Sequence, residues 1–422
     1  MAARDTFGAQ ATVHQQTREM PTAAVVRVLT CLVSAVVLLS ACARQPAPGT
    51  GTTLARSPAV TDTIWYMSAR ARDEEGRDTR RLADSLEYGF AIFRVGSADA
   101  RPGDTLSAHA LSRDIDLALV DSVRLTELEF VRALGRRAHS ARSSTDPTDD
   151  DDSLLALMVH GFGTGLHEAW DYAAQAHLRS RTRAPLVVFC WPSNGSGVAW
   201  PRAGEILVRA YREDSVAAAK SRPAFAKSLG TLLAAGGSDR LLIIAHSLGA
   251  QLVGETLASD STLRRHLRTA PLRALAYFAP DVATARFNDV VLPATATLAR
   301  RVVIYASSND KLLTLSRRVN RSERAGLLRG TVSIPSGLEL VDVTRGLSAE
   351  TRLQRMLGSH HALRRATSAL FDLFAIVANG YRAECRATLG TAQMKETGIW
   401  ELTSMSPPWQ YAAGTCTRQS SP

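Results

Sequence analysis

The stretch that decides the fold is Leu241–Leu257, which reads LLIIAHSLGAQLVGETL. Its first four residues are aliphatic and suit a short strand buried on both faces. From Leu248 onward, leucine and valine recur at helical spacing. Ser247 stands at the turn between the two, with Ala245 and Gly249 two residues to either side. A serine on a tight turn between a strand and a helix, with small neighbours, indicates a nucleophile elbow; the alternative is an ordinary connection with an incidental serine.

Other apolar runs of strand length alternate with helical patterns. The expected strands are Leu154–Val159, Pro185–Cys190, Leu272–Phe278, Arg301–Ala306 and, as the last one, Leu338–Val343. The expected helices are His167–Ser180, Tyr211–Ser221, Pro223–Ala235 and about 362–378. This alternation predicts an α/β fold, with a mostly parallel sheet and helices on both faces.

The segment before these strands and helices has a different pattern. We expect an antiparallel pair of strands at Thr63–Met67 and Tyr88–Val95, with a charged loop over residues 68–87 between them. A strand followed by a helix is expected over 117–134. The four consecutive aspartates Asp149–Asp152 are expected in a solvated loop, because a run lacks the alternating ligand spacing of a Ca²⁺ site, which is the alternative.

Composition restricts the class of protein. The chain has 422 residues, of which 45% are hydrophobic, and this suits one large α/β domain. Its net charge of +10 comes almost entirely from arginine. The basic residues form no stripe with interleaved aromatic side chains, so we expect no nucleic-acid partner. A solvated arginine-rich surface explains the charge, and attraction to anionic lipid head groups is the alternative.

The N-terminus carries a targeting pattern. Val25–Ala41 is a mainly apolar run that is too short for a comfortable membrane span. It ends in Leu-Ser-Ala before Cys42, which resembles the lipobox of bacterial lipoproteins. We therefore expect a signal peptide over 1–42, with translation starting at Met1 or Met20, lipidation of Cys42, and a Pro/Gly/Thr-rich tether over 43–60. A plain secretory signal and an uncleaved anchor are the alternatives.

The remaining cysteines agree with export. We expect the α/β domain to span 61–380 and a loop-rich C-terminal tail to span 381–422. An oxidising compartment would allow Cys385 and Cys416, both in that tail, to form a disulfide. Cys190 lies within an apolar strand and is expected to be a buried free thiol. No cysteine or histidine spacing suggests a zinc site, so we expect neither metal nor cofactor.

The strand Leu154–Val159 ends in the glycine-rich loop 160–165, which reads HGFGTG. Such a loop suits a backbone N–H donor for an oxyanion, and phosphate binding is the alternative. We expect the N–H groups of Phe162 and Leu248 to form this oxyanion hole. His246 adjoins the serine, but its side chain is expected to pack away from the elbow.

Acyl transfer by a serine also needs a base and an acid that orients it. The chain offers them in the order serine, aspartate, histidine: Ser247 as nucleophile, Asp310 as acid with Asp281 as its rival, and His360 or His361 as base. Each aspartate could instead cap a helix or turn, and each histidine could be a surface residue. Their joint occurrence, in order and after strand ends, favours a hydrolase-type site.

These motifs together resemble a bacterial α/β-hydrolase family of unknown function with a Val-His-Gly loop, a Trp-Pro-Ser strand end and an Ala-His-Ser-Met-Gly elbow. The matching residues are Val159–Gly161, Trp191–Ser193, Tyr211 with Asp214, Ala245–Gly249, Ala279–Asp281, Tyr305–Asp310 and His360, with Leu248 in place of methionine. The resemblance runs from about Thr63 to Ala378 and implies an α/β-hydrolase fold. It favours Asp310 and His360, although the late Gly-His-Ser-Tyr-Phe motif is only partly kept at 359–363.

We therefore expect a serine hydrolase that is anchored by lipid in the cell envelope and cleaves a small-molecule or lipid ester through an acyl-enzyme. Two alternatives stay open. One is a non-catalytic binding or scaffold domain with the same fold, and the other is an acyltransferase that passes the acyl group to an acceptor other than water. The family resemblance does not fix the substrate.

Overall fold

The computed structural model describes most of the chain between Thr61 and Leu402. The described residues are 61–95, 116–140, 154–180, 182–194, 205–329, 338–345, 367–378, 380–388, 392–395 and 398–402. The chain divides into two compact units, Met1–Thr50 with Ala199–Val208 and Gly51–Val198 with Arg209–Pro422. The fold below is that of the second unit.

The described residues of this unit form an 11-stranded sheet at its centre, in the order β10-β11-β9-β8-β7-β6-β4-β5-β1-β2-β3. The strands are β1 (Thr61–Arg72), β2 (Asp78–Val95), β3 (Leu117–Leu125), β4 (Leu155–Val159), β5 (Leu186–Cys190), β6 (Leu241–His246), β7 (Ala274–Phe278), β8 (Val302–Ala306), β9 (Glu339–Asp342), β10 (Ala392–Met394) and β11 (Trp400–Leu402). All neighbours from β11 to β1 run parallel, and only β10, β2 and β3 pair antiparallel. The sheet is therefore mostly parallel, as predicted.

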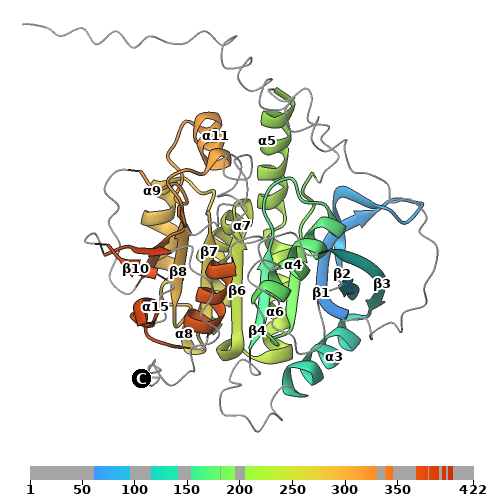
Figure 1. Cartoon of the computed structure of the whole chain (residues 1–422). Helices are drawn as coiled ribbons and strands as arrows, with labels where there is room; N and C mark the ends of the chain where they lie inside the picture. The colour runs from blue at the N-terminus through green and yellow to red at the C-terminus, as the bar shows by residue number, and fades with distance from the viewer. Residues whose placement is uncertain are drawn as a thin grey trace, which may run out of the picture. The chain divides into compact units, whose positions relative to one another are not determined.

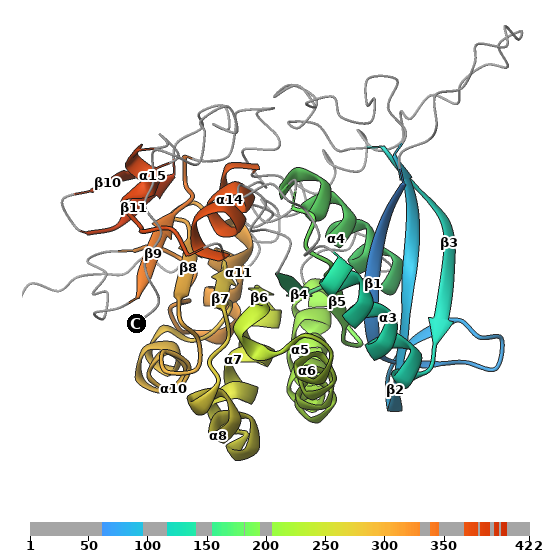
Figure 2. The ribbon, with the colours of Figure 1, turned by 90° about the horizontal axis from the view of Figure 1, so that it is seen from below.

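Helices cover both faces of the sheet (Figures 1 and 2). They are α3 (Glu127–Ser140), α4 (Leu166–Ser180), α5 (Glu205–Lys220), α6 (Arg222–Gly236), α7 (Leu248–Ser259), α8 (Ser261–Thr269), α9 (Thr284–Arg286), α10 (Leu292–Thr295), α11 (Lys311–Asn320), α14 (Thr367–Phe371) and α15 (Cys385–Thr388), with π-helical segments at Phe287–Val291 and Asp372–Ala378. Apolar side chains of α3, α6 and α7 pack on one face, and those of α4 and α14 pack on the other.

The side chains of β4 show why both faces need cover. Leu155, Leu157 and Val159 belong to the core under α6 and α7. Ala156 and Met158 belong to the core under α4. Because successive side chains of a strand point to opposite faces, a strand that is apolar at every position must be buried on both sides.

The centre of the sheet contains a point where the connections diverge. β4 lies between β5 and β6. The chain leaves β4 into α4 on one face and leaves β6 into α7 on the other. In open α/β sheets, ligands bind in the crevice outside the carboxyl ends of such strands. The glycine-rich loop and Ser247 follow these two strands.

The expected parallel strands and the helices around them are confirmed where the structure describes them; of the helix expected over about 362–378, the structure describes 367–378. Two expectations were wrong. The segment 68–87 is mostly strand, because β1 and β2 continue to a short turn after Arg72. Its sequence resembles a loop because many of its residues are charged and point outward from the sheet. Leu338–Val343 is not the last strand either, since β11 pairs with β9. The sheet thus extends past the predicted boundary at residue 380.

Within the described residues, none of the helices combines the length and apolar character needed to cross a bilayer.

Candidate active site

Ser247 occupies the turn between β6 and α7 with a φ of 54° and a ψ of −119°. A positive φ at a residue other than glycine is strained, at a cost of about 1–3 kcal/mol. Backbone bonds to the next strand hold this turn: the N–H of Ser247 donates to the carbonyl of Phe278 at 3.0 Å, and its carbonyl accepts from the N–H of Asp281 at 3.2 Å. The sequence prediction of an elbow at Ser247 therefore agrees with the backbone.

Two glycines allow the elbow to lie close to the end of β4. A Cβ on Gly161 would fall 2.8 Å from the Cβ of Ser247. A Cβ on Gly249 would fall 2.5 Å from the carbonyl oxygens of both Val159 and His160. The structure thus brings the glycine-rich loop directly beside Ser247, as the proposed oxyanion hole requires.

The two expected oxyanion donors lie on these adjoining segments. Leu248 is the first residue of α7, so its N–H has no acceptor within the helix. Phe162 follows Gly161, and its N–H donates to no acceptor among the described residues. The ring of Phe162 packs against that of Tyr211, with centroids 5.7 Å apart. Neither N–H group therefore has a backbone acceptor among the described residues, which the expected oxyanion role requires.

Buried side chains hold the glycine-rich loop in place. Asp214 accepts hydrogen bonds from the N–H of Gly163 at 2.9 Å and from the hydroxyl of Ser193 at 2.5 Å. The same hydroxyl oxygen accepts from the N–H of Thr164 at 3.1 Å. Burial raises the pKa of Asp214. The residues Ser193 and Asp214 noted in the family resemblance thus fix the loop conformation.

Arg70 completes this support and was missed from the sequence. One nitrogen of its guanidinium donates to the carbonyls of Thr164 at 2.6 Å and Ser193 at 3.0 Å. Arg70 lies in a run of charged residues that resembles a solvated loop, so no local pattern indicates its burial. Only the position of β1 beside β5 brings it to the loop.

Asp281, the rival acid, lies in a network of its own. Its carboxylate accepts from the hydroxyls of Tyr211 at 2.9 Å and Ser316 at 2.6 Å, and it pairs with Arg324 at 3.2 Å. Burial and the nearby Asp281 charge raise the pKa of Tyr211 to about 12, so this hydroxyl stays a donor at neutral pH. Asp281 therefore connects α5, α11 and the segment after β7.

Asp310 is fully buried at the N-terminus of α11, after β8. One carboxylate oxygen accepts from the N–H of Leu313 at 2.9 Å, as an N-cap does. β8 is the second strand from β6 in the sheet, with β7 between them. Asp310 and Ser247 thus follow parallel strands and lie at the same edge of the sheet.

The two candidate bases, His360 and His361, lie outside the described residues, as do Cys42 and Cys416. His246 stacks on Tyr172, with ring centroids 5.8 Å apart, in agreement with the predicted packing role. Cys190 is a buried free thiol, as predicted, and burial raises its pKa to about 12. Cys385 is buried in α15.

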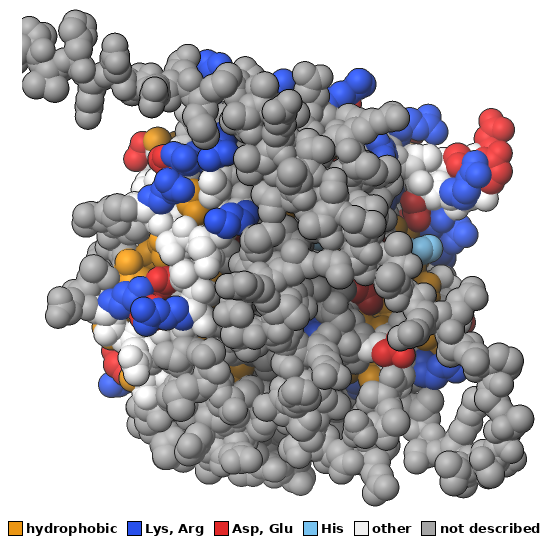
Figure 3. All heavy atoms as spheres, turned by 45° about the horizontal axis from the view of Figure 1, so that its top comes forward, with side chains coloured by type: hydrophobic (Ala, Val, Ile, Leu, Met, Phe, Trp, Pro, Cys, Tyr) orange, Lys and Arg blue, Asp and Glu red, His pale blue; other side chains and the backbone are white. Residues whose placement is uncertain are grey.

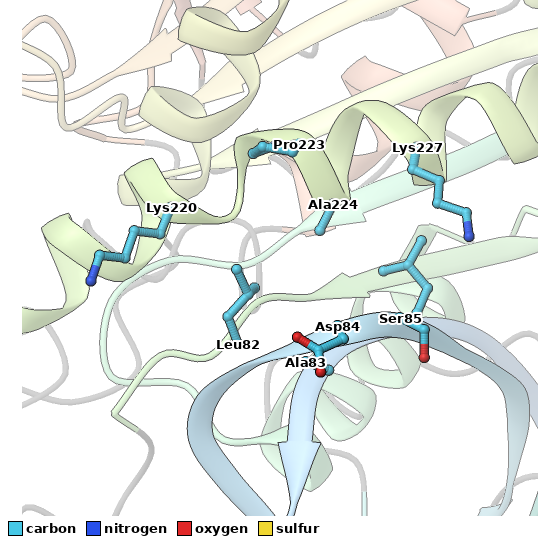
Figure 4. A pocket seen from close by; sticks show the side chains of 9 residues that line it. Leu82, Ala83, Asp84, Ser85, Lys220, Pro223, Ala224 and Lys227 are labelled. Carbon is cyan, nitrogen blue, oxygen red and sulfur yellow. The ribbon is translucent and has the colours of Figure 1, made fainter.

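The wider surface adds little to the site. In Figure 3 the top of Figure 1 is turned toward the viewer, and lysine and arginine side chains lie scattered over the described part of this face. A pocket of about 260 Å³ lies between residues 82–86 of β2 and the junction of α5 and α6, and Lys220 and Lys227 are among its lining residues (Figure 4). It contains none of the candidate catalytic residues. No cluster of three metal-ligating side chains occurs among the residues that the structure describes.

Comparisons with known proteins found a matching family model and several solved structures of low similarity. A family model described as an alpha/beta hydrolase of unknown function (DUF900) matches residues 138–356. No curated protein matches the chain. A predicted CIB-like hydrolase from Thermoplasma acidophilum is 14% identical, covers 52% of this chain and 87% of its own, and has a TM-score of 0.24. Prolyl oligopeptidase B from Galerina marginata is 11% identical over 76% of this chain and 37% of its own, with a TM-score of 0.26.

Proposed function

Because the chain belongs to the DUF900 family of α/β hydrolases of unknown function, we propose that it is a serine hydrolase that cleaves an ester through an acyl-enzyme. The observation that carries this proposal is the strained backbone of Ser247, at a φ of 54° beside the glycine-rich loop. Strain at a buried position persists only where the surrounding structure imposes it, and it concentrates at functional sites.

In the proposed reaction, the hydroxyl of Ser247 attacks the ester carbonyl while His360 takes its proton. The N–H groups of Phe162 and Leu248 stabilise the oxyanion. The proton on His360 passes to the leaving alcohol, which leaves an acyl group on Ser247. Water, deprotonated by the same histidine, then releases the carboxylic acid and restores the serine.

Asp310 is the proposed acid of this triad. The carboxylate of Asp281 is already occupied by two hydroxyls and Arg324. Asp310 is buried after β8, at the edge of the sheet that also holds Ser247, and one of its carboxylate oxygens caps α11. His361 remains the alternative base to His360, and acyl transfer to another acceptor remains the alternative outcome of the second step.

A fluorophosphonate probe tests the nucleophile directly. The wild-type full chain should be labelled, and Ser247→Ala should not be. Ser193→Ala serves as a serine control, because the hydroxyl of Ser193 is committed to Asp214; it should weaken labelling without abolishing it. Absence of labelling of the folded wild-type protein would falsify the proposal.

Two further experiments address the open alternatives. Comparing the activity of His360→Ala with that of His361→Ala decides which histidine is the base. Ester panels with product analysis separate hydrolysis from acyl transfer.

We further propose that the enzyme works in the cell envelope, held by lipid on Cys42 and tethered through residues 43–60. The lipobox-like sequence before Cys42 supports this proposal. Metabolic labelling with a fatty acid should mark the wild-type chain and leave Cys42→Ser unmarked, with that variant released from the membrane fraction. Equal labelling of the two chains would contradict the anchor.

A further inference from the structure

Arg70 is a buried cation whose hydrogen-bond acceptors are backbone carbonyls. It lies near the end of β1, and 6% of its surface is exposed. Its guanidinium donates to the carbonyls of Thr164 and Ser193. Its Nε is buried and has no hydrogen-bond partner among the residues that the structure describes. Burying a guanidinium costs several kcal/mol unless charge and hydrogen bonds compensate it.

Carboxylates near Arg70 act on it through charge and not through direct contact. Burial lowers the pKa of Arg70, and the charges of Asp78, Asp214 and Glu168 oppose this effect. By contrast, Arg72, two residues along the same strand, forms a direct pair with Glu87 at 2.7 Å. The positive charge of Arg70 is therefore only partly compensated where it contacts the loop.

The acceptors of Arg70 determine what it can do. Thr164 lies two residues after Phe162 in the loop, and its hydroxyl donates to the Phe162 carbonyl at 3.3 Å. Ser193 binds the same loop through the Thr164 N–H. Arg70 thus joins the ends of β1, β4 and β5 at the segment that presents the Phe162 N–H. A cation here also favours negative charge nearby, and its charge is among the causes that lower the pKa of His160.

We propose that Arg70 is a positioning residue for the reaction: it fixes the loop 160–165 so that the Phe162 N–H faces the oxyanion, and its charge stabilises the oxyanion further. This inference rests on the proposed serine hydrolysis. Because the oxyanion develops only on the way to the transition state, Arg70 should act on kcat more than on KM.

The test compares three variants of the full chain with an ester substrate. Arg70→Gln should lower kcat about 10- to 100-fold with KM changed less than about threefold, since losing one oxyanion donor outright costs about 100- to 1,000-fold. Arg70→Lys, which keeps the charge, should lose less than Arg70→Gln. Arg72→Gln removes a matched arginine from the same strand and should leave kcat near wild type.

Amide hydrogen exchange gives the second measurement. Arg70→Gln should speed exchange in peptides that cover 161–165, where Gly163 and Thr164 donate to Asp214 and Ser193. Arg72→Gln should not. An active wild type in which Arg70→Gln matches Arg72→Gln in kcat or in exchange overturns the role of Arg70 and leaves the proposed function intact. An inactive wild type that fails to bind the fluorophosphonate overturns the proposed function itself, and with it this role.

Discussion

At the scale of single residues, His160 shows how burial fixes a protonation state. Its ring stacks on Trp191, with centroids 5.2 Å apart. Its Nδ1 lies 3.0 Å from the carbonyl of Gly161, which can only accept, so this nitrogen carries the proton. Its Nε2 is buried, and within the described part of the chain it has no hydrogen-bond partner. Burial lowers the pKa of His160 to about 3, so the ring stays neutral at physiological pH.

This buried ring predicts a loss of stability in mild acid. Between pH 6.5, the ordinary histidine pKa, and the folded pKa of about 3, the unfolded chain binds a proton that the folded chain does not. The free energy of unfolding should therefore fall by about 1.4 kcal/mol per pH unit below 6.5 from this residue alone. Urea unfolding of wild type and His160→Asn at pH 7 and pH 4.5 measures it. Asparagine does not titrate, so the variant should lose less stability than wild type between these two values. Parallel losses would contradict the prediction.

At the scale of elements, α7 approaches β4 more closely than a side chain would allow. Gly249 lies in the first turn of α7, where a Cβ would fall 2.5 Å from two carbonyl oxygens of the β4 end. Backbone atoms cannot move aside cheaply, so the contact requires glycine. The short approach also sets the distance between the turn at Ser247 and the glycine-rich loop 160–165.

Replacing glycines in two helices should therefore have opposite effects. Gly249→Ala should destabilise the fold by about 1–3 kcal/mol, the usual cost of overpacking. Gly230→Ala, in α6, places its Cβ where nothing lies within 4 Å. It should stabilise the fold by about 0.5–1 kcal/mol, because alanine is the better helix former. Denaturant unfolding of both variants checks the pair, and a stabilised Gly249→Ala would show that α7 can shift.

At the scale of the whole molecule, a buried ion network fastens the C-terminal segment to the sheet. Arg386 of α15 is fully buried and bonds to Asp372 at 2.6 Å, and it also pairs with Glu339 of β9. The hydroxyl of Tyr305, in β8, donates to Asp372 at 2.7 Å. The network thus links β8, which leads to Asp310, with segments on both sides of the predicted domain boundary.

Breaking this network should destabilise the entire fold. Arg386→Met leaves the fully buried Asp372 without its cation and should cost about 3–5 kcal/mol in the free energy of unfolding. Arg382→Met, an exposed position before α15, is the matched control and should change stability by less than about 0.5 kcal/mol. Thermal and denaturant unfolding give the comparison. A single cooperative transition at wild-type stability in Arg386→Met would show that the segment after 380 is an appendage.

The parts that the sequence could predict are those encoded locally. The elbow is visible because the aliphatic run, the serine and the small residues Ala245 and Gly249 are neighbours in the chain. Arg70 could not be found this way, because its acceptors lie 94 and 123 residues further on. β11 has three residues, too few for periodicity, and its place depends on pairing with β9. Likewise, the charged residues of β2 lie on a strand only because β1 and β3 pair with it.

The placement of β1 sets an order of events for a chain made from its N-terminus. β1, β2 and β3 pair with one another and can form as a local antiparallel unit. The parallel partner of β1, however, is β5. Trp65 can pair with Val187 only after more than a hundred further residues have been made. Contacts at such sequence separation form late and slowly. The loop beside Ser247 therefore reaches its folded shape only after residue 193 has left the ribosome, and a chain cut short before that point exposes the β5-facing edge of β1 as a site for aggregation.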